Sequence, residues 1–165
     1  MSDISERSTV EIIVADFAIV DPAGKSNIVG AGIALLGFDP QQGITNRFSI
    51  WVSVLVPTSL CPAEFSVEFA LVDAAGELVL MPGPAGPQAL RIAQIVTAEK
   101  PNAQVPMAQR EHIGARVHLV IDFGAGLPLT PGSNYEWRIQ LDGDADRQTL
   151  YPFGVWGPSA PPVIG

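Results

Sequence analysis

Hydrophobic and polar residues alternate with a period of two along most of this chain. The segment 134–142, NYEWRIQLD, is the clearest case, because its apolar residues occupy every second position around Trp137. Such alternation is typical of an antiparallel strand with one face in the core and the other in solvent. The pattern recurs in RFSIWVSVLV (47–56), EFSVEFALV (64–72) and ARVHLVIDF (115–123). It predicts further strands at about 10–20, 27–36, 77–81, 89–97 and 148–156.

The turns between these segments support the same architecture. Asp21–Gly24 and Asp73–Gly76 both place Asp first and Gly fourth, which predicts a type I turn whose glycine takes the left-handed conformation. The segment 99–111 is interrupted by Pro101 and Pro106, so we expect a long loop with about one helical turn. The sequence therefore predicts an all-β fold. It is an antiparallel two-sheet β-sandwich, immunoglobulin-like or jelly-roll-like, with about 8–9 strands.

The domain organisation follows from where the alternation starts and stops. Residues 10–156 are predicted to form a single β-sandwich domain, preceded by an N-terminal tail (1–9) and followed by a Pro-rich tail (157–165). The second tail ends in two apolar residues, Val163 and Ile164. We expect these either to dock in a groove of a neighbouring subunit or to fold back onto their own sheet.

Composition and charge narrow the function classes. The net charge is −8 and the nine Lys and Arg residues are scattered, which disfavours nucleic acid and anionic membranes as partners. The segment MSDISERSTV has no apolar stretch of the kind found in signal peptides, and no run is long enough for a membrane span. We expect a virion location if the chain is phage-encoded and a cytoplasmic one otherwise. The single cysteine, Cys61, is expected to be a small semi-buried residue.

A glycine-rich stretch raises the question of a phosphate site. The segment 15–32 reads ADFAIVDPAGKSNIVGAG, and its Gly24-Lys25-Ser26 matches the end of a phosphate-binding loop. The glycine required five residues earlier is Ile19, and the third glycine of a dinucleotide fingerprint is replaced by Leu35. We therefore predict a hairpin turn followed by a strand.

Other residues with catalytic or metal-binding potential do not form a recognisable set. His112 and His118 lack further ligands at metal-binding spacing, and no serine lies in a nucleophile elbow. The segment 142–146, DGDAD, resembles the start of a calcium loop but lacks its glycine and its final acid. Glu64 and Glu68 share one face of a strand, where solvation is the expected role. We predict no enzymatic activity, no catalytic residues, no metal and no cofactor.

Trp51 departs from the pattern of its strand. It stands on the predicted outward face with Ser49 and Ser53, and Leu55 lies beside it. An outward tryptophan can anchor a partner protein, which makes Trp51 and Leu55 candidate partner contacts together with Val163 and Ile164. The alternative is that a loop such as 81–88 covers Trp51.

Both ends of the domain carry motifs that resemble a known family. The residues at the front are Ala15, Asp16, Phe17, Ala18, Asp21, Gly24, Lys25, Asn27 and Gly30 to Gly32. Those at the back are Leu129, Pro131, Gly132, Tyr135, Trp137, Ile139, Asp142 and Gly143. Over about residues 10–153 the chain resembles a β-sandwich family of unknown function from actinobacterial and phage-borne proteins. The resemblance implies a sandwich without a named reaction.

Two functions remain open on this basis. The first is a non-catalytic structural or assembly protein, such as a capsid-decorating subunit of a phage virion. It would bind itself, a shell protein or both, as a homo-oligomer or within a large assembly. The alternative is a cytosolic bacterial binding module for a small ligand or a partner protein.

Overall fold

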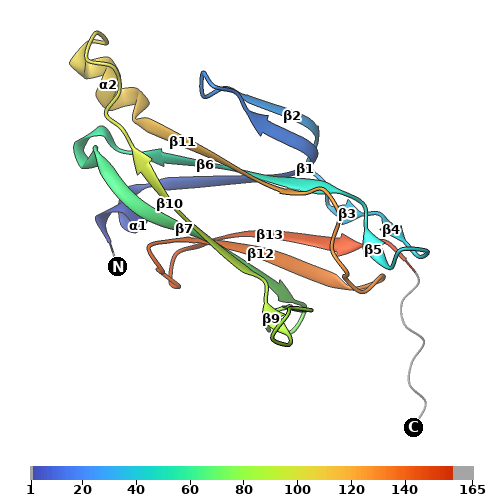
Figure 1. The fold of residues 1–165 in the computed structure, drawn as a ribbon. Helices are drawn as coiled ribbons and strands as arrows, with labels where there is room; N and C mark the ends of the chain where they lie inside the picture. Colours follow the sequence, from blue (N-terminus) through green and yellow to red (C-terminus); the bar gives the residue numbers. More distant parts are fainter. Residues whose placement is uncertain (1, 158–165) are drawn as a thin grey trace.

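The computed structural model describes residues 2–157, and these form an all-β fold with two packed sheets (Figure 1). The four-stranded sheet has the order β11–β6–β1–β2, with β1 (Thr9–Val20), β2 (Ser26–Ala31), β6 (Phe48–Val56) and β11 (Ala115–Phe123). The five-stranded sheet has the order β10–β7–β12–β13–β3, with β3 (Leu35–Leu36), β7 (Ala63–Asp73), β10 (Arg91–Ala98), β12 (Asn134–Leu141) and β13 (Gln148–Val155). Two small hairpins pair β4 (Phe38–Asp39) with β5 (Ile44–Thr45) and β8 (Leu80–Met81) with β9 (Gln88–Ala89).

The predicted antiparallel sandwich is confirmed, with more strands than expected. Eight of the thirteen described strands have six or more residues, and the other five have two residues each. Two residues are too few to show alternation, so the short strands left no signal in the sequence. The segment predicted as one strand at 27–36 divides into β2 and β3, and the pairing of β3 with β13 is parallel.

The core lies between the two sheets and is made by the alternating residues identified in the sequence. The Trp137 side chain on β12 is completely buried, as predicted. Its ring stacks on Phe123 of β11 with centroids 5.4 Å apart, and Phe123 stacks in turn on Phe48 of β6 at 4.8 Å. These three aromatic rings join the two sheets, and burying large apolar side chains is the main stabilising contribution in such a core.

The two Asp-initiated turns form as predicted and are nearly identical. Asp21 Oδ1 accepts hydrogen bonds from the N–H groups of Ala23 and Lys25, and Asp73 Oδ1 accepts the equivalent pair from Ala75 and Glu77. Gly24 and Gly76 both have positive φ, at 78° and 83°. The segment that resembled a phosphate loop is therefore the β1–β2 hairpin, whose turn is closed by an Asp side chain.

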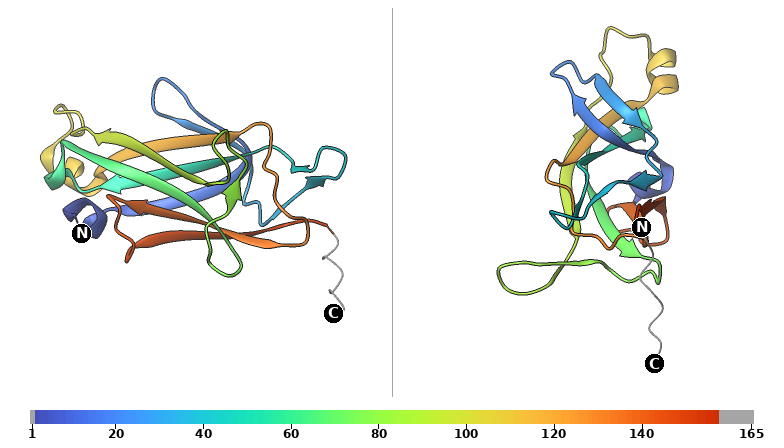
Figure 2. Two further views of the ribbon diagram at one scale, coloured as in Figure 1. Left: turned by 60° about the horizontal axis from the view of Figure 1, so that its bottom comes forward. Right: turned by 90° about the vertical axis from the view of Figure 1, so that its right-hand side faces the viewer.

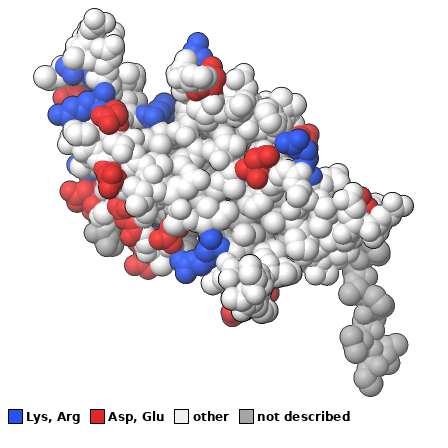
Figure 3. Space-filling view, in the orientation of Figure 1, with Lys and Arg blue, Asp and Glu red and all other residues white. Residues whose placement is uncertain are grey.

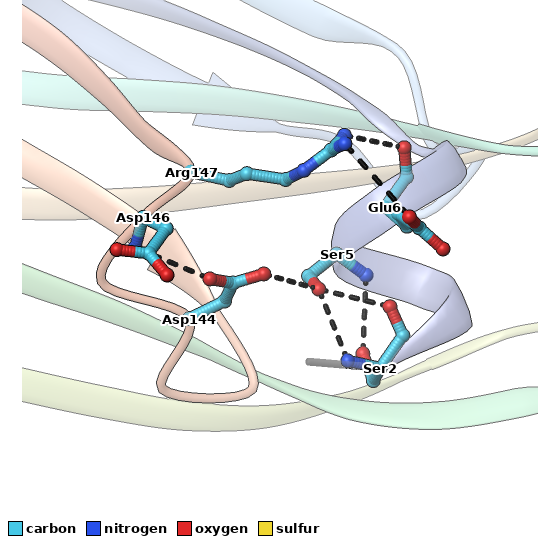
Figure 4. A network of polar contacts seen from close by, with 6 residues as sticks. All are labelled: Ser2, Ser5, Glu6, Asp144, Asp146 and Arg147. Atoms are coloured by element: carbon cyan, nitrogen blue, oxygen red, sulfur yellow. Dashed lines mark hydrogen bonds and ion pairs between the residues drawn. The ribbon is translucent and has the colours of Figure 1, made fainter.

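The N-terminal segment predicted as a tail is instead a docked helix, α1 (Asp3–Arg7). Ser2 caps it, and Ile4 is buried in the core cluster. The Ser5 hydroxyl donates to Asp144 Oδ2 at 2.8 Å, and the Arg147 guanidinium donates to the Glu6 carbonyl at 2.7 Å (Figure 4). These contacts use the β12–β13 turn, so the short helix is held by tertiary contacts 139 or more residues away in the sequence.

The loop between β10 and β11 carries a slightly longer helix than predicted. Helix α2 (Met107–Ile113) has seven residues, about two turns, and begins directly after Pro106. It ends at Gly114, whose φ is 64° and which leaves no room for a side chain against Leu55 and the Val56 carbonyl. Figure 2 shows α2 projecting at one end of the sandwich and the β8–β9 hairpin projecting separately. The predicted docking residues Val163 and Ile164 lie outside the described residues.

Candidate interaction surface

Trp51 lies on the outer face of the four-stranded sheet, as predicted, but the β1–β2 hairpin covers it. Its side chain is only 8% exposed. The indole N–H donates to Ser26 Oγ at 2.6 Å, and the Trp51 ring lies 5.3 Å from the ring of His118. His118 Nδ1 is 3.0 Å from the Gly24 carbonyl oxygen, which fixes the turn of the hairpin above β11. The proposed role of Trp51 as an exposed partner anchor is therefore wrong for this conformation, and the covering segment is not the loop 81–88.

The hairpin can fold back because β1 changes direction near its middle. Residues up to Ala15 pair with β6, and residues from Ala15 onward pair with β2, so the two ladders overlap only at Ala15. The Val14 carbonyl accepts from both Gly32 and Ile33, which is a local irregularity of the bulge type. Gly30 has a φ of 66°, and a side chain there would collide with Asp16. The glycines of the GAG segment thus permit the bend.

Asp16 does not make the contact that its position suggested. A carboxylate in an apolar strand is commonly paired with a backbone N–H group, and Lys25 across the hairpin is a further possible partner. In the structure Asp16 is exposed and lies against Gly30, and within residues 2–157 it has no recorded hydrogen bond or ion pair. Its contribution is therefore local: it lines an open pocket at the base of the hairpin.

The outer surface of the hairpin carries an apolar patch, formed by Phe17, Ile19 and Val29 and called here the hairpin patch. Phe17 and Val29 are direct cross-strand partners, and Ile19 lies two residues further along β1. Their exposed fractions are 40%, 48% and 61%. The Arg47 guanidinium lies 5.7 Å from the centroid of the Phe17 ring, and it also pairs with Asp122 at 3.4 Å. The hairpin patch is thus an exposed apolar surface with one cation at its edge.

The sequence contained a signal for the hairpin patch that alternation alone does not use. In IIVADFAIV (12–20) apolar residues occupy both faces of the strand, apart from Asp16. A strand that is apolar on both faces either is buried on both or exposes one of them. The structure shows that Ala18 is buried while Phe17 and Ile19 are exposed, so beyond Asp16 the odd-numbered positions of β1 form the surface.

The open pocket at the base of the hairpin has a volume of about 500 Å³ and mixed charge. Asp16, Asp39, Asn46 and Arg47 line it, together with Gly124 and neighbouring residues. Asp39 Oδ1 accepts from the backbone N–H groups of Gln41 and Gln42, and these bonds hold the pKa of its carboxyl below the usual range. The Asp39 carboxylate therefore stays charged to a lower pH than an ordinary aspartate, and it lines the same open pocket as Arg47.

The other predicted contact, Leu55, lies elsewhere. It is half-buried and lines a depression of about 160 Å³ between Arg7, the last residue of α1, and His112 of α2. Trp51 and Leu55 stand on the same face of β6, but the hairpin covers the first and α2 borders the second. The structure does not bring them into one surface, and the role of Leu55 as a partner contact stays a prediction.

The residues considered for metal or nucleophilic chemistry have structural contacts. Asp142 Oδ1 accepts from the Ser66 N–H, and its other oxygen accepts from the Ser2 hydroxyl, so the calcium-like turn holds α1 and β7. Cys61 is buried, and burial raises the pKa of its thiol. Across residues 2–157, no group of three or more His, Cys, Asp or Glu side chains is arranged to hold a metal ion. No helix in this range, whether α1, α2 or the 3-10 helix η1 (Thr58–Leu60), is long and apolar enough to cross a membrane.

Comparisons with known proteins give little further information. No protein-family model matches the chain, and no curated protein matches it. Among solved structures it is similar to the alkylpurine DNA glycosylase AlkC of Pseudomonas fluorescens, bound to DNA containing an abasic-site analogue. The TM-score is 0.42 and the identity 11%, over 89% of this chain and 31% of that one. This chain therefore spans about a third of the glycosylase, and a likeness at that level carries no argument about function.

Proposed function

We propose that this protein is a non-catalytic assembly protein that decorates the capsid of a phage, docking on a shell protein through the hairpin patch. One observation carries the proposal: three large apolar side chains, Phe17, Ile19 and Val29, are exposed together on a hairpin that is itself fixed to the body. Exposed apolar clusters on a soluble domain are typical of protein contact sites. The family resemblance supplies the phage setting.

The hairpin is suited to docking because its conformation is already determined. Ser26 bonds to Trp51, and the Gly24 carbonyl bonds to His118, so the strands that carry the patch are held against the sheet. A partner would not have to order this segment on binding, and lower ordering costs leave more of the contact energy as affinity. Fully burying one such side chain contributes about 1.5–3 kcal/mol, so three of them can support a contact that is repeated around a shell.

The experiment is to look for the chain in phage particles released by the strain that encodes it. Mass spectrometry of purified particles should find the chain at a stoichiometry comparable with that of a shell protein, and labelled antibody should mark the particle surface. The variant Phe17→Asp should be lost from particles. The matched control is Leu150→Asp, which adds the same charge at an exposed apolar residue on β13 of the other sheet. Particles without the chain, or particles that retain Phe17→Asp as fully as the control, would refute the proposal.

A second candidate function is favoured by the open pocket that Asp16, Asp39 and Arg47 line. A pocket of about 500 Å³ that is lined by both acidic and basic side chains suits a small polar molecule that carries both an amine and an acid group. In this case the chain would be a cytosolic binding module. A thermal-shift screen with free amino acids as the probe tests it. A saturable rise in melting temperature that Arg47→Met abolishes would favour this function, and a flat response to all of them would reject it.

A further inference from the structure

Strand β10 forms one edge of the five-stranded sheet, and it has few of the features that normally protect such an edge. Figure 1 shows it in yellow-green, running between the β8–β9 hairpin and the loop to α2. Edge strands are usually short, or carry lysine or proline that discourages pairing with other chains. The opposite edge, β3, has only two residues, whereas β10 has eight, RIAQIVTA, with one charge at its first position.

The register shows which backbone groups of β10 face the free edge. Leu71 N–H donates to the Leu90 carbonyl, and this pair directly continues the register of the β7–β10 ladder, in which Ala70 is the partner of Arg91. In an antiparallel ladder every second residue is hydrogen-bonded to the neighbour, so the even-numbered residues of β10 bond to β7. The bond from Asp142 N–H to the Ser66 carbonyl agrees, because it assigns the even-numbered residues of β7 to β12. The N–H and C=O groups of Ala93, Ile95 and Thr97 therefore point to the free edge.

The same residues carry the exposed side chains of the strand. Ile95 is 73% exposed, more than any other large apolar side chain in the described part of the chain. Ala93 and Thr97, two positions to either side, are small and exposed. Figure 3 shows an area without charged side chains on the face that carries β10, bordered by acidic residues at the lower left, by basic residues at its lower end and by a group of both charges on its right. An uncharged strand edge with one protruding isoleucine is therefore available for contact.

The geometry points to a second copy of this chain as the occupant: we propose that two β10 strands pair antiparallel about a two-fold axis through Ile95. The odd-numbered residues then form the hydrogen-bonded pairs, as their outward backbone groups require. Ile95 faces the partner's Ile95, and Ala93 faces the partner's Thr97. Arg91 faces the partner's Glu99, so the two ends of the ladder are closed by opposite charges. This pairing does not rest on the proposed capsid role.

Charge complementarity selects this register from the neighbouring ones. An axis through Ala93 would place Arg91 opposite the partner's Ile95, and an axis through Thr97 would place Glu99 opposite the partner's Ile95. Both alternatives place a charged side chain opposite Ile95, so that the charged group has no partner of opposite charge. Arg91 already contacts Glu68 on the outer face of the sheet at 3.0 Å, so its guanidinium is held on the face where the partner's Glu99 would lie.

Cysteine cross-linking tests the register directly. In the proposed dimer the two Cα atoms at position 95 are about 5.5 Å apart, which is within the range that a disulfide spans. Positions 93 and 97 are each about 13 Å from the same position in the partner, at roughly 3.3 Å per residue over four residues. Mild oxidation should therefore give a covalent dimer of twice 17.4 kDa with Ile95→Cys. In non-reducing electrophoresis the matched variants Ala93→Cys and Thr97→Cys should run as monomers. The unmodified chain, whose Cys61 is buried, should do the same.

Light scattering provides the second measurement. The unmodified chain should show a concentration-dependent mass between 17.4 kDa and twice that value. Ile95→Lys should raise the dissociation constant of the dimer at least tenfold with an unchanged melting temperature in dilute solution, since the side chain is exposed. Leu150→Lys, on β13 of the same sheet, should dimerise like the unmodified chain. A chain that stays monomeric, an Ile95→Lys variant that dimerises normally, or cross-linking that favours position 93 or 97 would overturn the proposal. None of these outcomes depends on the particle experiment.

Discussion

The outer faces of the two sheets arise from the same alternating pattern but differ in how they are covered. On the four-stranded sheet Ser49, Trp51 and Ser53 are all buried, because the β1–β2 hairpin and neighbouring side chains lie over them. On the five-stranded sheet the equivalent positions, such as Ser66 and Gln140, remain partly exposed to solvent. The face that the alternation predicts to point outward is thus partly exposed to solvent in the five-stranded sheet and covered by the chain itself in the four-stranded sheet. The difference comes from one bent hairpin.

The largest expected effect on stability comes from removing the Trp137 side chain from the core between the two sheets. Trp137→Ala should lower the free energy of unfolding by about 3–5 kcal/mol, because it empties a fully buried site that joins both sheets. Chemical denaturation monitored by circular dichroism measures this loss. Trp156→Ala is the control, since that side chain is 64% exposed, and it should change stability by less than about 0.5 kcal/mol. Equal effects of the two variants would contradict the assignment of the core.

The two Asp-initiated turns allow the covered face to be tested separately. Gly24→Ala and Gly76→Ala should each cost about 1–2 kcal/mol, because both glycines have positive φ and an added methyl group meets little else. The two stabilities should therefore fall equally. Only Gly24→Ala should alter the tryptophan emission spectrum, because only that turn lies over Trp51 and His118. Identical spectra for both variants would show that the hairpin does not rest on Trp51 in solution.

Two side-chain hydrogen bonds compare the faces at a smaller scale. The bond from the buried Trp51 to Ser26 lies under the β1–β2 hairpin, whereas the one from Gln140 Nε2 to Glu68 lies on the uncovered face. A double-mutant cycle of Trp51→Phe with Ser26→Ala should give a coupling of about 1 kcal/mol. The cycle of Gln140→Ala with Glu68→Ala should give a coupling of only a few tenths, about 0.3 kcal/mol, because water competes for these groups. A reversed order would mean that burial does not distinguish the two faces.

The smallest effect concerns acid stability at the α1 contact. The pKa of Asp144 is lowered from its ordinary value. The largest cause is the hydrogen bond from the Ser5 hydroxyl, and a further bond from the Asp146 N–H acts in the same direction. A lowered pKa in the folded state means that the charged carboxylate contributes stability above the ordinary value, about pH 4, and that this is lost as the pH falls through the folded value.

On acidification below about pH 4, Asp144→Asn should therefore lose less stability than the unmodified chain. Its melting temperature should depend less steeply on pH. Asp146→Asn is the control, because no comparable contact to α1 involves its side chain among the described residues. Equal slopes for Asp144→Asn and the unmodified chain would contradict the role assigned to the Ser5 contact.

The sequence predicted those parts of the fold that depend on local pattern. The strands 47–56, 64–72, 115–123 and 134–142 were identified because their apolar residues alternate, and the two turns because Asp and Gly have fixed roles in them. Helix α1 was missed because five residues cannot form a helix without a docking site, and that site lies beyond residue 140. The sequence left open whether a loop covers Trp51, but it did not identify the β1–β2 hairpin as the cover, because this depends on a bend at Ala15 that a pattern of period two does not reveal. The two proposed surfaces, the hairpin patch and the β10 edge, depend on the position that each strand takes within its sheet.

The docking of α1 on the turn around Asp144 also affects the order of events during synthesis. Helix α1 is synthesised before its contacts at 142–147, which lie more than 130 residues further along the chain. Until then Ile4 has no complete core to enter, and the first strand can pair with β6 while the segment before it remains undocked. Contacts of such long sequence separation form late because the loop they close is large. The attachment of α1 is thus a step that can follow only after the turn between β12 and β13 has been synthesised.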